Sequence, residues 1–245
     1  MTEENVRAIL LDIEGTTTPI EFVYEVLFPY ARREVREFVR QNYHEADLQS
    51  DIFALKAEHQ SDIEQSHQPP AWLEGSPDVE TESVVHYVSW LMDQDRKSKA
   101  LKSLQGKIWK GGYLGGSLKG QVYPDVVPAF KRWRNRERSI YIFSSGSVLA
   151  QKLLFAHTTE GDLTNYLSGY FDTAMGAKTD ASSYRAIADR IGSLPAEILF
   201  VSDVIPELDA ARTAGMETVL CVRPGSLEPK SSQHQIIRTF GVIFS

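Results

Sequence analysis

The feature that most constrains this 245-residue chain is an apolar run near its start that ends in two acidic residues. Residues 6–11 read VRAILL, and Asp12 and Glu14 follow at once. Such a run predicts a strand buried on both faces, as in the middle of a parallel sheet. Asp12 and Glu14 then lie at the carboxyl end of the strand, the edge at which open α/β sheets bind ligands. Taken alone, the stretch is equally compatible with a ligand-binding site and with an ordinary strand end followed by a solvated turn of Asp and Glu.

The spacing of the two acids predicts a cation site. Asp12 and Glu14 are two residues apart, so their side chains project to the same side of an extended chain. Two carboxylates held that close repel each other unless a cation or a shared proton offsets their charge. We expect Mg²⁺, because it is a hard cation that prefers oxygen ligands. Gly15 lets the backbone turn sharply there, and residues 16–18, all threonine, offer hydroxyls and amides.

The second half of the chain alternates short apolar runs with helical patterns. That alternation predicts an α/β fold, a doubly wound, Rossmann-like parallel sheet with helices on both faces. Gly215 is placed to end one of the helices. After the first strand, the predicted strands are residues 139–143, 170–173, 197–201, 218–222 and 241–244.

An all-helical stretch separates the first strand from the others. Residues 21–120 show helical spacing of apolar side chains and no strand pattern. Pro29 predicts a kink or two consecutive helices, and the glycines of residues 106–120 predict loops that return to the sheet. The expected organisation is therefore a core domain of residues 1–20 and 121–245 with a helical domain of residues 21–120. An insertion at the carboxyl edge of a strand is expected to cover the site as a cap.

Further polar residues stand at the ends of two later strands. Ser144 and Ser145 follow one, Asp203 follows another, and Lys178 precedes a predicted helix. Each has an ordinary interpretation: the serines or Asp203 could cap the next helix, and Lys178 could be a solvated surface residue. Since parallel strands end at one edge of a sheet, their joint occurrence instead favours a single site next to the two acids.

This set of residues suits transfer of a phosphoryl group to a carboxylate. Attack by an anion on a phosphate is hindered unless positive charge offsets the repulsion. Mg²⁺ held by Asp12 and Asp203 would supply part of that charge, and Lys178 the rest. Ser144 and the amides after it would bind phosphate oxygens. Asp12 would form an aspartyl-phosphate, and Glu14 would give a proton to the leaving oxygen and later take one from water.

The chain resembles the haloacid-dehalogenase-like superfamily, and within it the acireductone synthases, the bifunctional enolase-phosphatases of methionine salvage. The resemblance covers nearly the whole chain and is weakest between residues 44 and 80. The stretches that carry it are residues 11–17 (LDIEGTT), 122–125 (VYPD), 143–147 (FSSGS), 150–155 (AQKLLF), 157–162 (HTTEGD), 171–178, 183–185, 199–204 (LFVSDV) and 222–225 (VRPG), together with Glu207.

The resemblance implies one Mg²⁺ per subunit, a helical cap and a specific reaction. Its implied substrate is 2,3-diketo-5-methylthiopentyl-1-phosphate, which is enolised and then dephosphorylated to the acireductone. Implied metal and nucleophile positions are Asp12, Glu14 and Asp203, and implied phosphate or substrate contacts are Ser144, Ser145 and Lys178. Glu14 stands where the wider superfamily has a second aspartate, and Ser202 where it often has glycine or aspartate; both are features of the enolase-phosphatase branch. Whether Glu14 contacts the metal directly or through water is left open.

Alternatives remain at this point. A phosphatase of the same superfamily acting on another phosphorylated metabolite would share the core chemistry, and a catalytically inactive binding protein could share the fold. A haloacid dehalogenase is disfavoured, because that branch needs no metal and has no acid two residues after its nucleophile. For the base of the enolisation step, the choice lies between Glu14 and a residue of the cap.

Composition bounds the partners and the compartment. The formal net charge of −7 argues against nucleic acid as the main partner. No run approaches the ~20 apolar residues that a membrane-spanning helix needs. The single cysteine, Cys221, indicates a reducing compartment, and the polar, acidic residues 1–5 do not resemble a targeting signal. We therefore expect a cytoplasmic (in a eukaryote, cytoplasmic or nuclear) monomer whose partner is a small phosphorylated substrate.

Overall fold

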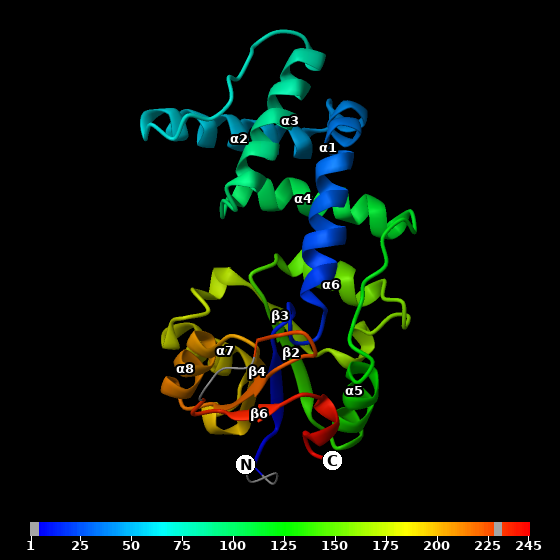
Figure 1. Ribbon diagram of the computed structural model, residues 1–245, viewed down its shortest axis with the longest axis vertical. Helices are drawn as coiled ribbons and strands as arrows, with labels where there is room; N and C mark the ends of the chain where they lie inside the picture. The colour runs from blue at the N-terminus through cyan, green and yellow to red at the C-terminus, as the bar shows by residue number, and fades with distance from the viewer. Residues whose placement is uncertain (1–4, 228–231) are drawn as a thin grey trace. The chain divides into compact units, whose positions relative to one another are not determined.

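The computed structural model describes residues 5–227 and 232–245, which form two compact units. The sheet unit takes in Met1–Val23 and Lys119–Ser245, and the helical unit is Tyr24–Leu118. Strands occur in the first unit, whereas the second is built from helices (Figure 1). That residues 21–120 cover the site as a cap stays a prediction.

The sheet unit is built on a six-stranded parallel sheet, which confirms the predicted fold class. The strand order is β3-β2-β1-β4-β5-β6, so the first strand of the chain lies at the centre and pairs with β2 on one side and β4 on the other. The chain order reverses about β1, which makes its carboxyl end the switch point at which such sheets bind ligands. The strands are β1 (Ala8–Leu11), β2 (Ser139–Phe143), β3 (Gly169–Phe171), β4 (Ile198–Ser202), β5 (Glu217–Cys221) and β6 (Gln235–Ile237).

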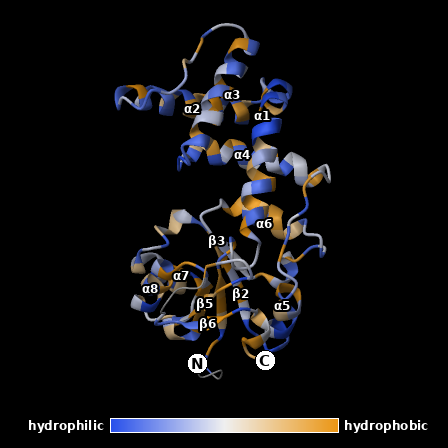
Figure 2. Ribbon diagram, viewed as in Figure 1, coloured by the Kyte–Doolittle hydropathy of each residue, from blue (hydrophilic) through white to orange (hydrophobic). Residues whose placement is uncertain are grey.

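Helices cover both faces of this sheet. Ala8 and Leu10 of β1 face a core that also contains residues of α7 (Ala181–Ile191) and α8 (Ile205–Thr213). On the opposite face α5 (Val126–Asn135) packs against β2 (Figure 1). All four residues of β1 are fully buried for that reason, and the strands are among the most hydrophobic segments in Figure 2. The sheet therefore encloses β1 between two paired strands and two layers of helices.

The helical unit begins within a short π-helix and continues through four α-helices. Pro29 lies in the first turn of α1, which follows the π-helix directly, so two consecutive helices meet beside it, one of the two outcomes that the sequence predicts. Helix α1 packs against α3 and α4, and α2 packs against α4. The elements are the π-helix η1 (Phe22–Leu27), α1 (Phe28–Asn42), α2 (Ala46–Glu64), α3 (Pro77–Asp93) and α4 (Lys99–Leu114).

The prediction that residues 106–120 form loops is wrong for the first half of that stretch, because α4 continues to Leu114. Gly112 is buried, and a Cβ there would lie 2.7 Å from the ring of Tyr30 and 2.8 Å from Leu118. The glycine therefore allows α1 to approach α4 closely instead of ending the helix. Local glycine content cannot distinguish these two uses.

The predicted last strand at residues 241–244 is also wrong. That segment begins in the 3₁₀ helix η5 (Phe240–Val242), and the sixth strand is formed earlier, by β6. The Thr239 hydroxyl accepts a hydrogen bond from the amide of Gly241, which turns the chain away from the sheet.

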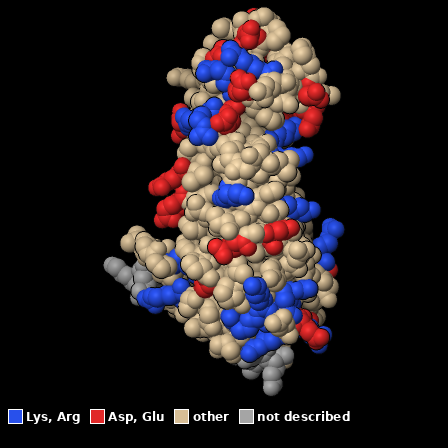
Figure 3. All heavy atoms as spheres, turned by 90° about the vertical axis from the view of Figure 1, so that its right-hand side faces the viewer, with Lys and Arg blue, Asp and Glu red and all other residues tan. Residues whose placement is uncertain are grey.

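Side chains of α5 and the turn after it occupy the carbonyl groups that a strand would need. Arg132 donates to the carbonyl oxygens of Ile243 and Phe244, both at 3.1 Å, and Arg136 to that of Phe244 at 2.7 Å. The Trp133 indole donates to Ile243 O at 3.1 Å. Lys and Arg side chains gather over the part of the surface where α5 lies (Figure 3). Arg132 and Arg136 hold the C-terminal segment against this helix.

Among the described residues, no helix combines the length and apolar character that crossing a bilayer requires.

Candidate active site

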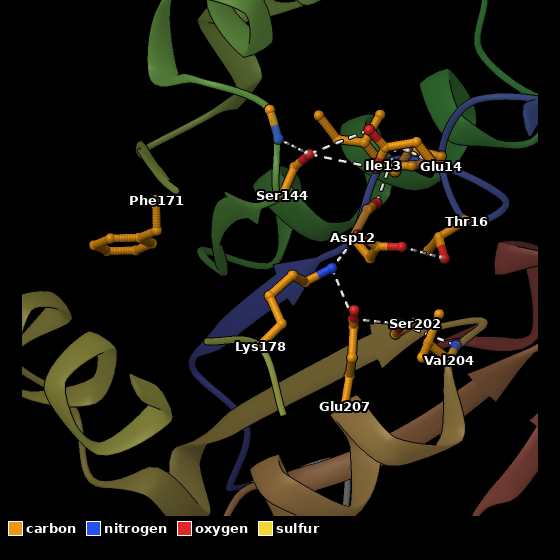
Figure 4. A network of polar contacts seen from close by, with 12 residues as sticks. Asp12, Ile13, Glu14, Thr16, Ser144, Phe171, Lys178, Ser202, Val204 and Glu207 are labelled. Carbon is orange, nitrogen blue, oxygen red and sulfur yellow. Dashed lines mark hydrogen bonds and ion pairs between the residues drawn. The ribbon is translucent and has the colours of Figure 1, made fainter. Parts of the chain in front are cut away.

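The carboxyl ends of β1, β2 and β4 bring together the polar residues that the sequence singles out. Asp12 follows β1 directly, and its amide donates to the carbonyl of Val201 in the neighbouring β4. Ser144 follows β2, and Asp203 follows β4. Because the strands are adjacent and parallel, three segments distant in sequence meet at one edge (Figure 4).

Lys178 reaches this edge from the loop before α7 and lies between two carboxylates. Its Nζ is 2.5 Å from Asp12 Oδ1 and 2.7 Å from Glu207 Oε2 (Figure 4). Burial opposes the charge on this ammonium group, but the charges of Asp12 and Glu207 outweigh it and raise the pKa of Lys178 above its usual value. Lys178 is therefore a buried cation directed at Asp12, so the interpretation as a solvated surface residue is wrong.

Glu207 is a site residue that sequence reasoning did not assign. It lies in the first turn of α8, where its carboxylate accepts hydrogen bonds from Lys178 and, at 3.1 Å, from the Ser202 hydroxyl. The available signal was its position: it comes four residues after Asp203, in the first turn of the helix that follows. Glu207 holds Lys178 in place on the side opposite Asp12.

Asp12 is 2 % exposed and is held from several sides. The Thr16 hydroxyl lies 3.4 Å from Asp12 Oδ2, and the Thr17 hydroxyl donates to the Asp12 carbonyl at 3.2 Å. One carboxylate oxygen thus contacts Lys178 and the other contacts Thr16. This arrangement fixes the orientation of the carboxylate at the end of the central strand.

Glu14 is turned toward the end of β2. Its two carboxylate oxygens lie 3.4 and 3.3 Å from the Ser144 hydroxyl, which can donate to one or the other (Figure 4). Burial, together with the charge of Asp12, raises the pKa of Glu14 to about 7. A carboxyl group with a pKa near neutrality can exist in either protonation state, as a general acid and base must.

Asp203 carries a buried oxygen for which the described residues offer no partner. That atom is Oδ1, and burial together with the charge of Asp12 raises the pKa of Asp203 to about 7. The other oxygen faces Gly15, where a Cβ would lie 2.3 Å from Asp203 Oδ2. Gly15 also has φ +73°, so the turn needs glycine for its backbone conformation as well as for space.

The donor set fits a hard divalent cation beside Asp12 and Asp203. The unpartnered Asp203 oxygen is a free carboxylate ligand, and the raised pKa of this carboxyl shows that a positive charge bound beside it would be favoured. Within the described part of the chain, however, no three acidic, histidine or cysteine side chains are arranged as a ready metal cluster. Glu14 faces Ser144 instead, so its role as a further ligand stays a prediction.

The ordinary interpretation of the remaining candidates as helix caps is wrong. Helix α6 (Val148–Ala156) is capped by Ser147, whose hydroxyl accepts from Ala150 N, so Ser144 and the exposed Ser145 lie in the loop before it. The residue before α8 is Val204, not Asp203. Helix capping therefore does not account for the presence of these polar groups at the strand ends.

A cavity of about 380 Å³ adjoins Asp203 at the carboxyl ends of β4 and β5. Its walls present polar groups as well as apolar side chains. They are formed by Ile205, Pro206, Leu220, Cys221, Val222, Ser226 and Leu227.

Comparison with known proteins assigns this arrangement to a family. The model of the haloacid dehalogenase-like hydrolases matches residues 6–215. The chain belongs to this family. It is 48% identical to "Enolase-phosphatase E1" of Synechococcus elongatus over 96% of this chain and 97% of that protein. The protein of the same name from Danio rerio is 43% identical, over 97% and 94% of the two chains.

The solved structures agree with this haloacid dehalogenase-like assignment. The crystal structure of the unknown transcript 4 protein of Saccharomyces cerevisiae has a TM-score of 0.77 and 35% identity, over 97% of this chain and all of that one. A haloacid dehalogenase-like phosphatase from Thermococcus onnurineus has a TM-score of 0.57 at 20% identity, a likeness of fold alone. With relatives this similar over nearly their whole length, the chain is a hydrolase and a phosphatase.

Proposed function

We propose that this haloacid dehalogenase-like phosphatase is a Mg²⁺-dependent enolase-phosphatase of methionine salvage. It would convert 2,3-diketo-5-methylthiopentyl-1-phosphate into the acireductone 1,2-dihydroxy-3-keto-5-methylthiopentene and phosphate. The observation that carries the proposal is a buried Asp12 carboxylate that contacts Lys178 and whose charge acts on Asp203, a carboxylate with one oxygen unpartnered among the described residues. The name shared by the relatives supports the substrate.

Asp12 is the proposed nucleophile of the phosphatase step. One of its oxygens forms a bond to phosphorus, the bond between phosphorus and the ester oxygen breaks, and Glu14 gives its proton to that oxygen. Water then attacks the aspartyl-phosphate while Glu14 takes a proton from it. Phosphate leaves and the Asp12 carboxylate is restored. The position of Glu14, two residues from Asp12 with a pKa near neutrality, supports this exchange of roles.

The remaining residues offset charge and bind phosphate. Lys178 would approach a phosphate oxygen without leaving Asp12, and Ser144 and Ser145 would contact the other phosphate oxygens from the loop before α6. Mg²⁺ bound beside Asp12 and Asp203, with Glu14 as the third expected position, would neutralise charge on the phosphate and polarise the carbonyl oxygens.

The enolisation step needs a base close to the carbon next to a carbonyl. Glu14 is the proposed base, because a carboxylate with a raised pKa can accept that proton at neutral pH. Glu14 also lies near the carboxyl end of β1, two residues after Asp12. The proton that it takes in this step could then serve the leaving oxygen in the next. In the cavity beside Asp203, the side chains of Ile205, Leu220 and Val222 would contact an apolar end of the substrate.

The test follows both halves of the reaction at once. The purified protein would receive the diketo phosphate with Mg²⁺ and, separately, with excess chelator, while phosphate release and the ultraviolet absorbance of the enol are recorded. We expect both signals with Mg²⁺ and neither with chelator. Phosphate from other esters but not from this one would contradict the substrate and leave the phosphatase. Enol formation without phosphate release would contradict the assignment of Asp12.

A further inference from the structure

Arg223 lies in a buried polar cluster to which the reaction described above assigns no role. The residue follows β5 directly after Val222 and is 3 % exposed. Its Nε and Nη2 both donate to the carbonyl oxygen of Thr16, at 2.9 and 2.7 Å. Two N–H groups of one planar guanidinium thus converge on a single carbonyl oxygen, a contact that a lysine ammonium group does not reproduce. Residues 207 positions apart in sequence are joined in this way.

Other groups hold Arg223 so that it can do this. Its Nη1 donates to Asp125 Oδ2 at 2.7 Å, and the same oxygen accepts from the Phe240 amide at 2.6 Å and the Thr239 hydroxyl at 2.9 Å. The guanidinium also lies 4.2 Å from the ring centre of Tyr123 and 4.5 Å from that of Phe240. A buried charge needs such pairing, so the cluster acts as one unit.

The cluster binds the turn that carries the proposed nucleophile. We define the catalytic turn as residues 12–18. Its Thr16 hydroxyl is directed at Asp12 Oδ2, and the next carbonyl, that of Thr17, accepts from the Tyr123 amide at 3.0 Å. Two successive carbonyls of the turn are therefore bonded to segments outside it. We infer that Arg223 is a positioning residue, which fixes Thr16 and through it the Asp12 carboxylate that the proposed function requires.

This inference gives a role to two motifs that otherwise have none. Residues 122–125 (VYPD) and 222–225 (VRPG) supply Tyr123, Asp125 and Arg223, which meet at the catalytic turn. Each motif contains a proline next to a residue of the cluster, which limits the backbone freedom of the segment that presents it. In this proposal the motifs act on the reaction through the carbonyl groups of the catalytic turn that they bind.

Arg132 provides a matched control. It also donates to carbonyl oxygens of a distant segment, those of Phe240, Ile243 and Phe244 at 2.7, 3.1 and 3.1 Å. None of these carbonyls belongs to the catalytic turn, and at Phe240, the one residue shared with the cluster, Arg132 binds the carbonyl whereas Arg223 contacts the ring. Replacement of either arginine by lysine therefore removes a similar number of hydrogen bonds, and only Arg223→Lys releases Thr16.

The experiment compares Arg223→Lys, Asp125→Asn and Arg132→Lys with the natural chain. Phosphate release is measured for the diketo phosphate and for a simple aryl phosphate at saturating Mg²⁺, alongside circular dichroism and melting temperature. For Arg223→Lys we expect kcat to fall by about 10- to 100-fold with KM changed less than about 3-fold, since a displacement of order 1 Å has such an effect. Asp125→Asn should also lower kcat more than it changes KM, but by a smaller factor. Arg132→Lys should lower the melting temperature with kcat nearly unchanged.

Two results would overturn the inference. An unchanged kcat in folded Arg223→Lys would do so, as would equal losses of kcat in the Arg223 and Arg132 variants at matched loss of melting temperature. If Arg223→Lys does not fold, the isosteric Asp125→Asn decides by the same criteria. A natural chain that hydrolyses the aryl phosphate but not the diketo phosphate would contradict the proposed substrate while still allowing the comparison.

Discussion

At the scale of single residues, the site is a set of charges arranged around Asp12. Lys178 contacts one Asp12 oxygen, and the charge of Asp12 helps raise the pKa values of Glu14 and Asp203. Burial alone would disfavour every one of these charges. Asp12 contacts Lys178 and acts on both Glu14 and Asp203, which is why its replacement is the most informative.

Asp12→Asn should keep the fold and abolish phosphate release. An amide has nearly the shape of the carboxylate but is a poor nucleophile, so we expect a loss of at least about 10³-fold in kcat, as for other removed nucleophiles. Phosphate release and circular dichroism measure the two effects. Asp162→Asn is the control, because Asp162 lies in an exposed turn, where it accepts hydrogen bonds from Thr164. A folded Asp12→Asn protein with near-normal activity would remove Asp12 as the nucleophile.

At the scale of elements, the turn after β1 and the end of β4 determine each other. Gly15 adopts φ +73° with its Cα against the Asp203 carboxylate, so the shape of one loop sets the position of the side chain in the other. Sequence reasoning assigned the sharp turn to Gly15. The contact with Asp203 depends on the pairing of β1 with β4 and could not be inferred locally.

Gly15→Ala should damage the site beyond its effect on the backbone. The new methyl group would lie 2.3 Å from Asp203 Oδ2 and displace that carboxylate. We expect activity to fall by at least about 10-fold and the free energy of unfolding by about 1–3 kcal/mol. Gly192→Ala is the matched control, since Gly192 has φ +77° and open space around it. It should lose about 1 kcal/mol and keep its activity. Similar activities for the two variants would contradict the role given to Gly15.

Two neighbouring glycines of α4 should respond in opposite directions to alanine. A Cβ at Gly111 would have nothing within 4 Å, so Gly111→Ala should stabilise the helix by about 0.5–1 kcal/mol. At Gly112 the methyl group would meet Tyr30 and Leu118 below 3 Å, so Gly112→Ala should destabilise by about 1–3 kcal/mol. Urea unfolding followed by circular dichroism measures both. Equal effects would show that Gly112 does not mediate the approach of α1 to α4.

At the scale of the whole molecule, the sheet unit carries the complete set of candidate catalytic residues. The helical unit has a core of its own, with Leu55, Val84 and Leu104 fully buried. A division into a unit that performs chemistry and a unit that selects substrates would fit this distribution. A cation bound beside Asp12 and Asp203 would join the ends of β1 and β4, so its binding should affect the stability of the sheet unit.

Mg²⁺ should raise the melting temperature of the natural chain. A ligand that binds only the folded state stabilises it by about 2.7 kcal/mol at 100 times its dissociation constant, and relief of the repulsion between Asp12 and Asp203 is the physical source. Differential scanning calorimetry with increasing Mg²⁺ measures the shift. Asp203→Asn should start from a higher melting temperature without Mg²⁺ and respond less to the ion. An identical Mg²⁺ response in both proteins would contradict the assignment of Asp203.

The sequence by itself determined the alternation of strands and helices, the central position of β1 and the residues at the strand ends, because burial on both faces and turn chemistry are local patterns. Only the tertiary structure decided which distant groups meet. Glu207 contacts Lys178, Arg223 contacts Thr16, and Arg132 binds carbonyl groups of the last apolar run. Such contacts depend on the order of the strands in the sheet and on how closely the helices pack. The periodicity of apolar residues along the chain predicts neither.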